Sequence, residues 1–375
     1  MILVLNSGSS TLKYRVVDPA DPGTGERGLI ERIGEPGGVA DHHAALLRLF
    51  AELAVDRADL RAVGHRVVHG GSRFAAPVLV DDEVLAGIRD LVPWAPLHNP
   101  GSIAGLEAVR ALLPGVPNVA VFDTAFHRTL PEAAAAYAID QALAHRLGIR
   151  RYGFHGTSHR YVAEQTALLL GRPLETLNLI VLHLGNGASA AAIAAGRSVD
   201  TSMGFTPLEG LVMGTRSGDI DPAVLIHLHR TMGLSFAEVD DLLQHHSGLT
   251  GLCGDNDMRT VLRRRAAGDP DARLAFDVYC HRIRKYVGAY HAVLGRLDAI
   301  AFTAGVGEHA AEVRAASLAG LDIWGITVDP HRNAPGPGAR VISPDDAAVA
   351  VCVVPTDEEL AIALAVAELV PGRRL

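Results

Sequence analysis

Short apolar runs alternate with longer amphipathic segments along the whole chain, and this alternation predicts the secondary structure. The short runs have the length and composition of buried strands, and most end at Gly, Asp or Pro. They cover residues 2–6, 12–17, 62–70, 118–123, 179–185, 299–305 and 350–355. The longer segments have helical periodicity and cover residues 42–54, 84–92, 102–113, 159–170 and 358–369. The alternation predicts an α/β protein with polar residues just after its strand ends.

The first two predicted strands are joined by an unusual turn in the stretch VLNSGSSTLKYRVV, residues 4–17. It has the glycine, serines and lysine of a phosphate-binding loop, but it lacks the Walker pattern and no helix follows it. A second stretch of the same plan, VLHLGNGASAAAIAAGRSV, places Asn186 180 positions after Asn6. The repeat is either a coincidence of common turn chemistry or a duplicated domain whose two turns offer N–H groups to a nucleotide. The repeat alone does not decide between them.

Composition favours a globular protein and argues against a nucleic-acid-binding or membrane-spanning one. A chain of 375 residues predicts two or three domains, and 49% hydrophobic with 20% charged residues is typical of a globular protein. A net charge of −8 with scattered arginines argues against a nucleic-acid partner. Cys253, Cys280 and Cys352 form no C-x-x-C pair, which favours a reducing, cytoplasmic location with the thiols buried. No apolar stretch approaches the ~20 residues of a membrane span.

Eight polar segments follow the first turn in a defined order. They are residues 64–71, 95–102, 121–127, 151–159, 200–222, 254–259, 302–309 and 355–359. This ordered series resembles the acetate kinase (acetokinase) family, and the resemblance covers residues 1 to about 370. It implies two domains of duplicated ribonuclease-H-like (actin-like) topology flanking a nucleotide cleft. Domain I is expected at residues 1–148 plus 360–375, and domain II, for nucleotide binding and dimerisation, at 149–359.

The resemblance also implies an activity: reversible, Mg²⁺-dependent transfer of the ATP γ-phosphoryl to acetate, giving acetyl phosphate and ADP, by a homodimer. Mn²⁺ could replace Mg²⁺. A carboxylate acceptor is already an anion at neutral pH, so the enzyme needs cations and in-line positioning more than a strong base. Arg66 and Arg216 stand among glycines at strand ends and match the family's catalytic arginines. A guanidinium can grip a carboxylate or phosphoryl group with two parallel hydrogen bonds.

His155 and Asp123 complete the expected catalytic set. The ring of His155 could donate a hydrogen bond to the transferring phosphoryl group. His155 and His159 are four apart, but a zinc site is discounted because no third ligand is evident and a glycine interrupts the helix. The helix is expected to start near Thr157 or Ser158. The resemblance places His98 near the site and gives His127 no role.

Mg²⁺ prefers oxygen ligands and takes few of them from protein. The resemblance implies that Asn6 and Glu358 are the metal-linked residues. Asp123 is a further metal-linked acid by resemblance, and it could instead orient Arg66 or Arg216 as an ion-pair partner. Glu358 has a structural alternative, because TDEE at residues 356–359 reads as a capping box from Thr356 to Glu359.

The nucleotide and acyl sites are larger sets carried over from the family. The expected nucleotide-binding residues are Asn6, Ser9, Thr11, Lys13, His183, Leu184, Gly185, Asn186, Gly187, Asp257, Met258, Arg259, Ala304, Gly305, Val306, Gly307 and His309. The expected acyl pocket comprises Arg66, Val68, Leu97, Phe154 and Pro207. Apolar residues beside glycine-rich turns usually belong to the core. The pocket is not enlarged, so acetate is the expected substrate and propionate a poorer one, because one methylene is worth about 1–3 kcal/mol.

Three features depart from the family pattern: His309 stands where asparagine is usual, Met258 where an aromatic is frequent, and residues 18–41 form a shortened segment. The shortening falls away from every catalytic motif, so a trimmed peripheral flap is expected. Two other functions stay open. One is a kinase for propionate or butyrate, and the other is an actin-like nucleotide-binding module without an acyl substrate. The second is disfavoured because such a module needs no carboxylate clamp.

Overall fold

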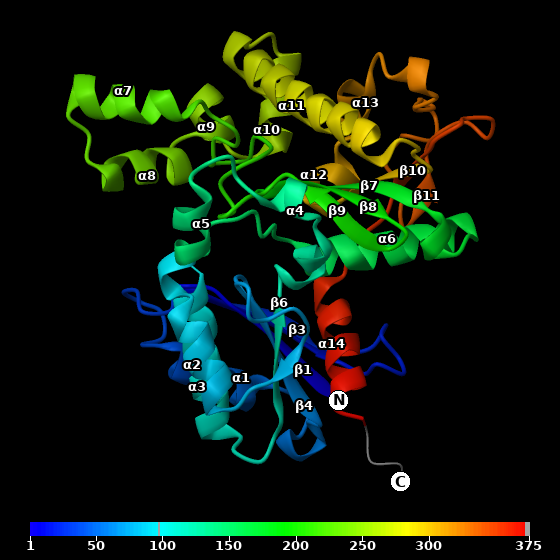
Figure 1. Cartoon of the computed structure of the whole chain (residues 1–375). Coiled ribbons are helices and arrows are strands. Elements are labelled where there is room, and N and C mark those ends of the chain that lie inside the picture. The colour runs from blue at the N-terminus through cyan, green and yellow to red at the C-terminus, as the bar shows by residue number, and fades with distance from the viewer. Residues whose placement is uncertain (97, 372–375) are drawn as a thin grey trace. The chain divides into compact units, whose positions relative to one another are not determined.

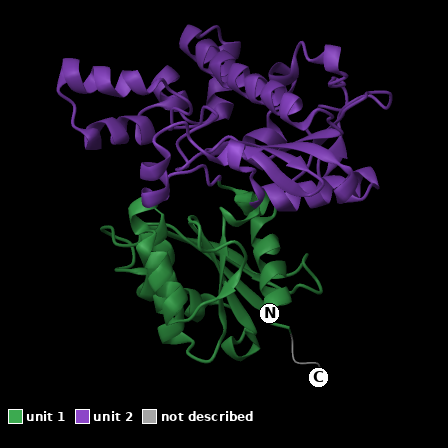
Figure 2. Ribbon diagram, in the orientation of Figure 1, with its two compact units in different colours: residues 1–128, 154–158, 357–375 green, residues 129–153, 159–356 purple. Residues whose placement is uncertain are grey.

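The computed structural model describes residues 1–96 and 98–371 and divides them into two compact units (Figure 2). Unit 1 comprises residues 1–128, 154–158 and 357–375, and unit 2 comprises residues 129–153 and 159–356. The changeovers therefore lie near residues 128 and 357, whereas the sequence places the domain boundaries at 148 and 359. The division into domains at those boundaries stays a prediction.

Unit 1 is a mixed six-stranded sheet with helices on both faces (Figure 1). Its strands are β1 Ile2–Ser7, β2 Thr11–Val17, β3 Arg27–Glu31, β4 Ala62–Val67, β5 Val78–Leu79 and β6 Asn118–Phe122. Its helices are α1 His42–Glu52, η1 Arg57–Asp59, α2 Asp82–Asp90, η2 Val92–Trp94, α3 Asn99–Leu112 and α14 Glu358–Leu369, and η3 Ala125–Thr129 ends at the border of the unit. The predicted strands and helices of this unit are confirmed.

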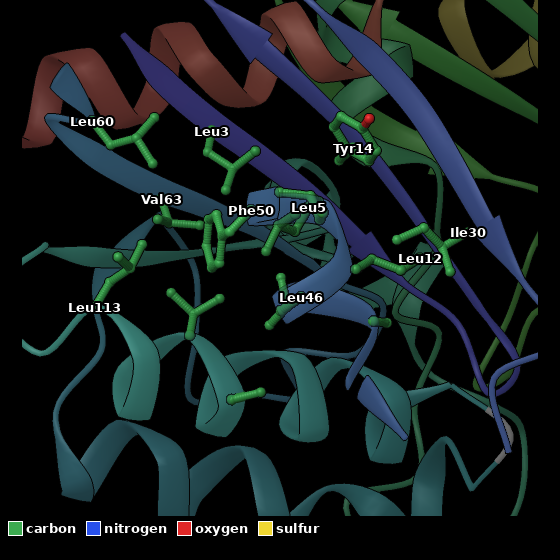
Figure 3. Packing of buried hydrophobic residues seen from close by; sticks show 14 of the residues in the cluster. Leu3, Leu5, Leu12, Tyr14, Ile30, Leu46, Phe50, Leu60, Val63 and Leu113 are labelled. Carbon is green, nitrogen blue, oxygen red and sulfur yellow. The ribbon is translucent and has the colours of Figure 1, made fainter. Parts of the chain in front are cut away.

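Both faces of the unit 1 sheet are buried because successive side chains of a strand point to opposite sides. Leu3 and Leu5 of β1 pack with α1 and α3, as Figure 3 shows for this cluster. Ile2 and Val4, one position out of phase, pack with α14. The last helix of the sequence thus closes the core around the first strand.

Unit 2 is a second mixed six-stranded sheet with additional helices. Its strands are β7 Asn178–Leu184, β8 Ala188–Ala194, β9 Arg197–Thr201, β10 Ala299–Thr303, β11 Arg340–Val341 and β12 Ala350–Val353. Its helices are α4 Glu132–Ala135, α5 Gln141–Leu147, α6 Gly156–Leu170, η4 Leu174–Thr176, α7 Pro222–Met232, α8 Phe236–His245, α9 Gly248–Cys253, α10 Met258–Ala266, α11 Pro270–Leu294, α12 Ala304–His309, α13 Ala311–Leu318 and η5 Asp322–Trp324. The first turn of α6 groups with unit 1. The long α11 packs on β7 and β8, and the small side chains of β8 leave room for it.

The two sheets have the same topology, which confirms the predicted duplication. Sheet order is β3-β2-β1-β4-β6-β5 in unit 1, and reading the second sheet from β9 gives β9-β8-β7-β10-β12-β11. In each, the first strand is antiparallel to the second and parallel to the fourth. Among the described residues, no helix combines the length and apolarity that a bilayer crossing requires.

The strand registers correct one detail of the repeat. The last pair of the first hairpin is Ser7 with Leu12, and the last pair of the second is Leu184 with Ala188. Equivalent positions in the first strand of each hairpin are therefore 177 apart, so the structural counterpart of Asn6 is His183. Asn186 lies inside the shorter second turn. The spacing of 180 thus indicated the duplication but matched the wrong residues.

Candidate active site

The guanidinium of Arg66 is the centre of a cluster of oxygen atoms in unit 1. Its Nε and Nη2 donate to the two carboxylate oxygens of Asp123 at 3.1 and 2.5 Å, and its Nη1 donates to Asn6 Oδ1 at 3.3 Å. The Arg66 Nε also lies 3.7 Å from a carboxylate oxygen of Glu358. Neighbouring parallel strands β1, β4 and β6 end at the same edge of the sheet, which brings these residues together. The sequence alternative that Asp123 pairs with Arg66 is thus observed.

Arg66 stays charged in this setting. Its side chain is 18% exposed and that of Asp123 only 1% exposed. Burial by itself lowers the pKa of Arg66, but the carboxylates of Asp123, Glu358 and Glu359 together raise the pKa above its ordinary value. A permanent, oriented cation therefore lies at this edge of the sheet.

The start of α14 places three consecutive carboxylates against cations of the sheet. Asp357 accepts from Arg15 at 2.7 Å, Glu358 lies near Arg66, and Glu359 lies 2.5 Å from the ammonium nitrogen of Lys13. The predicted capping box from Thr356 is wrong: Asp357 is the N-cap, and its side chain accepts from the backbone N–H of Leu360. An aspartate is among the best N-caps, and the Arg15 contact fixes it there.

The turn before α6 brings His155 next to Asp123. The backbone N–H of Gly156 donates to the carbonyl of Asp123 at 2.9 Å, and a Cβ at position 156 would clash with this oxygen. The helix begins at Gly156, slightly before the expected position. His155 has a φ of 55°, a left-handed conformation that is costly for a residue with a Cβ. The turn therefore places the backbone of His155 directly before the Gly156–Asp123 contact.

His127, which the sequence left without a role, supports this turn. Its Nε2 lies 3.0 Å from the carbonyl oxygen of Phe154, and because a carbonyl only accepts, Nε2 carries the hydrogen. Burial lowers the pKa of His127 to about 4, so the ring is neutral. The apolar residues around it in VFDTAFH were the available sign of a buried residue.

Two apolar residues of the expected acyl pocket lie in unit 1. Val68 and Phe154 are buried at 7% and 1% exposure. The ring of His69 lies edge-on between Phe154 and Trp94, with ring centres 5.4 and 5.5 Å away. His69 and Trp94 were missed because nothing in the sequence separates them from ordinary core residues. Leu97 lies outside the described residues.

The β1–β2 turn is held closely against two helices. Gly8 donates to the carbonyl of Thr11 at 2.8 Å, and its own carbonyl accepts from His42 of α1 at 2.8 Å. A Cβ at Gly101 of α3 would lie only 2.5 Å from that carbonyl. Ser9, at the tip, is exposed, so the tip of the turn is accessible while its base is fixed.

Arg216 lies in unit 2, in the irregular segment after β9. Its Nη1 donates to the carbonyl of Pro207 at 2.7 Å, and burial lowers the pKa of its guanidinium. Arg216 and Pro207, both expected site residues, are therefore in direct contact.

The β7–β8 turn meets the segment that carries Arg216. Gly185 donates to the carbonyl of Gly187 at 3.0 Å, which closes the turn. The carbonyl of Asn186 accepts from Gly214 at 2.9 Å, and its side chain accepts from Asn256 at 3.4 Å. The turn is thus joined to two other predicted site segments of unit 2.

The remaining nucleotide-site residues divide into surface and interior positions. Asp257 caps α10 and forms an ion pair of 2.7 Å with the exposed Arg259, whereas Met258 between them is 4% exposed. Ala304 has a φ of 63° at the start of α12, where Gly305 is exposed, Val306 half-buried and His309 exposed. Leu184, His183 and Gly307 are buried.

Comparisons with known proteins match this arrangement over almost the whole chain. The model of the Acetokinase family matches residues 1–364. An acetate kinase of Streptomyces avermitilis is 58% identical, over 96% of this chain and 95% of its own. The crystal structure of Porphyromonas gingivalis acetate kinase has a TM-score of 0.92 at 40% identity, over 97% of this chain and 98% of its own. A propionate kinase structure from Francisella tularensis gives the same score, identity and coverage.

Proposed function

Because the chain belongs to the acetokinase family, we propose that it catalyses reversible, Mg²⁺-dependent transfer of the ATP γ-phosphoryl group to acetate, giving acetyl phosphate and ADP. The observation that carries this proposal is the Arg66 guanidinium, held along one edge by both oxygens of Asp123. An arginine fixed in this way keeps its remaining N–H groups in a set orientation for an anionic substrate.

Direct in-line transfer needs charge neutralisation on the moving phosphoryl group and on the acyl oxygen that attacks it. We infer that Arg66 and Arg216 provide the positive charge and that His155 donates a hydrogen bond to the phosphoryl group. Asp123 then acts as a positioning residue for Arg66. Val68, Phe154 and Pro207 would contact the methyl group of acetate.

The residues near Arg66 fit Mg²⁺. Among residues 1–96 and 98–371, no three His, Cys, Asp or Glu side chains come together as a complete metal site. Asn6, Asp123 and Glu358 instead offer a few oxygen donors, as suits an ion that takes its other ligands from phosphate and water. Asn6 and Glu358 would hold Mg²⁺, which when bound neutralises phosphate charge.

Acetate is favoured over propionate by the relatives. The solved acetate and propionate kinases resemble this chain equally, so the backbone does not separate the two substrates. Four curated relatives of 56–59% identity are acetate kinases. Propionate should react more slowly, at a cost of about 1–3 kcal/mol for the extra methylene.

A hydroxamate assay with ATP, Mg²⁺ and acetate, propionate or butyrate tests the proposal. We expect acyl hydroxamate with acetate, less with propionate, and least with butyrate. No product from any of the three acids would contradict the kinase and favour a nucleotide-binding module instead. Arg66→Ala and Arg216→Ala should each lower kcat about 100-fold or more if they neutralise the transition state.

We also propose a homodimer in the cytoplasm. Helices α7 and α8 expose large apolar side chains, with Met232 at 69% and Phe236 at 77% exposure, as expected of a surface that a second copy covers. Light scattering should give twice the chain mass, and Phe236→Asp should shift it toward the monomer. The three cysteines are free and buried, which supports a reducing compartment.

A further inference from the structure

The segment that carries Pro207 and Arg216 has no regular secondary structure. It runs from the end of β9 at Thr201 to the start of α7 at Pro222. Met203, Leu211 and Met213 in this segment are fully buried, so the segment is packed although it is irregular. Buried irregular backbone needs side chains to satisfy its polar groups, because no ladder of main-chain hydrogen bonds does so.

Arg151 donates hydrogen bonds to the backbone carbonyls in the first part of this segment. Its Nη1 donates to three successive carbonyls, those of Thr201, Ser202 and Met203, at 3.1, 3.2 and 3.2 Å. Its Nη2 donates to Glu209 Oε1 at 2.7 Å. One guanidinium therefore joins the end of β9 to a residue further along the segment.

Tyr137 holds the other oxygen of the same carboxylate. Its hydroxyl donates to Glu209 Oε2 and accepts from the backbone N–H of Phe205, the latter at 2.9 Å. A Cβ at Gly204 would clash with both the Glu209 carboxylate and the Tyr137 hydroxyl. Glu209 thus has a partner on each oxygen. The contact is possible because residue 204 is a glycine and has no Cβ.

A second set of contacts closes the far end of the segment. The backbone N–H of Gly210 donates to Asp219 Oδ1 at 2.9 Å, and Tyr286 donates to Asp219 Oδ2 at 2.9 Å. Arg282 donates to the carbonyl of Gly210 at 3.0 Å. Residues 210–219 therefore form a closed loop with Arg216 near its tip.

Pro207 links Glu209 to the guanidinium of Arg216. It lies two positions before Glu209, and its carbonyl accepts from Arg216 Nη1 at 2.7 Å. Any shift of Glu209 moves this carbonyl, and with it the direction of the Arg216 fork. A misplacement of ~1 Å is enough to cost an enzyme about 100-fold in rate.

We propose that Glu209, held between Tyr137 and Arg151, is a positioning residue that orients Arg216 for phosphoryl transfer. The inference rests on the proposed catalytic role of Arg216. Neither Tyr137 nor Glu209 is among the residues expected to contact ATP or acetate. Their effect on the reaction therefore passes through the segment that carries Pro207 and Arg216.

Tyr137→Phe is the test variant, because it removes one hydroxyl and keeps the ring. We expect kcat with acetate to fall about tenfold while KM for ATP stays within about twofold, since the lost hydroxyl contacts Glu209 and Phe205 and not Gly214, which meets the β7–β8 turn. Glu209→Gln should have a larger effect, because an amide group would then face the Arg151 cation. Tyr279→Phe is the matched control: its hydroxyl is buried without a hydrogen-bond partner in the described chain, and its loss should leave kcat unchanged.

The decisive measurement repeats Tyr137→Phe in an Arg216→Lys background. If Tyr137 acts through the fork of Arg216, its loss should change kcat less than about twofold there, because lysine has no fork to orient. An unchanged kcat for Tyr137→Phe alone, or the same loss in both backgrounds, would overturn the inference. Full kcat in Arg216→Lys alone would instead refute the role of the Arg216 fork, and hydroxamate formation by the wild type would still stand. ATP binding by calorimetry shows that each variant is folded.

Discussion

Both carboxylate oxygens of Asp123 accept hydrogen bonds from Arg66, at 3.1 and 2.5 Å, in an environment where Asp123 is only 1% exposed. A parallel pair of this kind fixes the plane of the guanidinium as well as its position. The pair links the end of β4 to the residue after β6, so the sheet itself sets the direction of the cation.

Asp123→Asn should preserve the size of the side chain but lose the paired hydrogen bonds that orient Arg66. An amide offers only one acceptor oxygen, so one N–H of Arg66 loses its partner and the guanidinium can rotate. We expect kcat to fall about 100-fold or more. The control is Asp82→Asn, which weakens an exposed pair with Arg110 and should leave kcat unchanged. Near-normal turnover of Asp123→Asn would show that Arg66 is oriented by other contacts.

Gly101→Ala should displace the β1–β2 turn. The added Cβ would lie 2.5 Å from the carbonyl of Gly8, so the turn or the helix must shift. Helix propensity alone would favour alanine by up to about 1 kcal/mol, which makes a loss of activity informative. We expect KM for ATP to rise several-fold. Gly115→Ala, whose Cβ would meet nothing within 4 Å, should behave as wild type. Equal KM values for the two variants would refute the steric argument.

Stability should fall in mild acid because of two buried histidines. Burial lowers the pKa of His65 and of His127 to about 4, while the hydrogen bonds to Asn118 and to the Phe154 carbonyl act in the opposite direction. In the unfolded chain their pKa is about 6.5. Between these values the unfolded state binds more protons, so the free energy of unfolding falls as pH drops from about 6.5 to 4.

The loss should be on the order of 2–3 kcal/mol for each histidine, fully expressed near pH 4 and absent above about pH 7. Urea unfolding midpoints measured across this range give the slope. His127→Gln should flatten it, whereas replacing the exposed His43 by Gln should not. If the slope of His127→Gln matches that of wild type, His127 is not the source of the pH dependence.

Arg314→Lys should weaken nucleotide binding from a distance. Arg314 is completely buried, donates to the carbonyls of Gly307 and Glu308 at 2.9 Å each, and is joined at both its Nε and its Nη2 to Asn333. It holds the C-terminal end of α12, whose first residues are expected at the adenosine. A lysine ammonium cannot span these partners. We expect KM for ATP to rise more than kcat falls.

Arg332→Lys is the matched control, because its carboxylate partner Asp345 is exposed and such pairs contribute little. Steady-state kinetics with ATP as the varied substrate compares the two. An unchanged KM in Arg314→Lys would mean that α12 keeps its place without the arginine.

The strands and helices could be predicted from the sequence because the spacing of apolar residues in each reflects which side chains are buried. The duplication was visible as well, but the match of Asn6 with Asn186 was wrong, since one turn is longer than the other. A spacing in sequence does not report turn length. Strand register, which depends on pairing across the sheet, is needed to equate Asn6 with His183.

The missed residues include two that we propose act through others. His127 and Tyr137 each donate one hydrogen bond to a partner that lies 27 and 72 positions away, respectively. Histidine and tyrosine occur throughout ordinary cores, so neither residue type points to such a role. The local pattern predicts Thr356 as the helix cap, whereas the cap is Asp357, which also accepts a hydrogen bond from Arg15, 342 positions away.

The place of α14 has a consequence for synthesis on the ribosome. Ile362, Ala363 and Val366 cover the face of the sheet formed by Ile2 and Val4. While the nascent chain elongates, that apolar face stays uncovered until residues 358–369 have emerged. Unit 2 precedes α14 along the chain, so it can complete its core before unit 1 does. A chain truncated within α14 should therefore bind chaperones and aggregate through unit 1, although its unit 2 is folded.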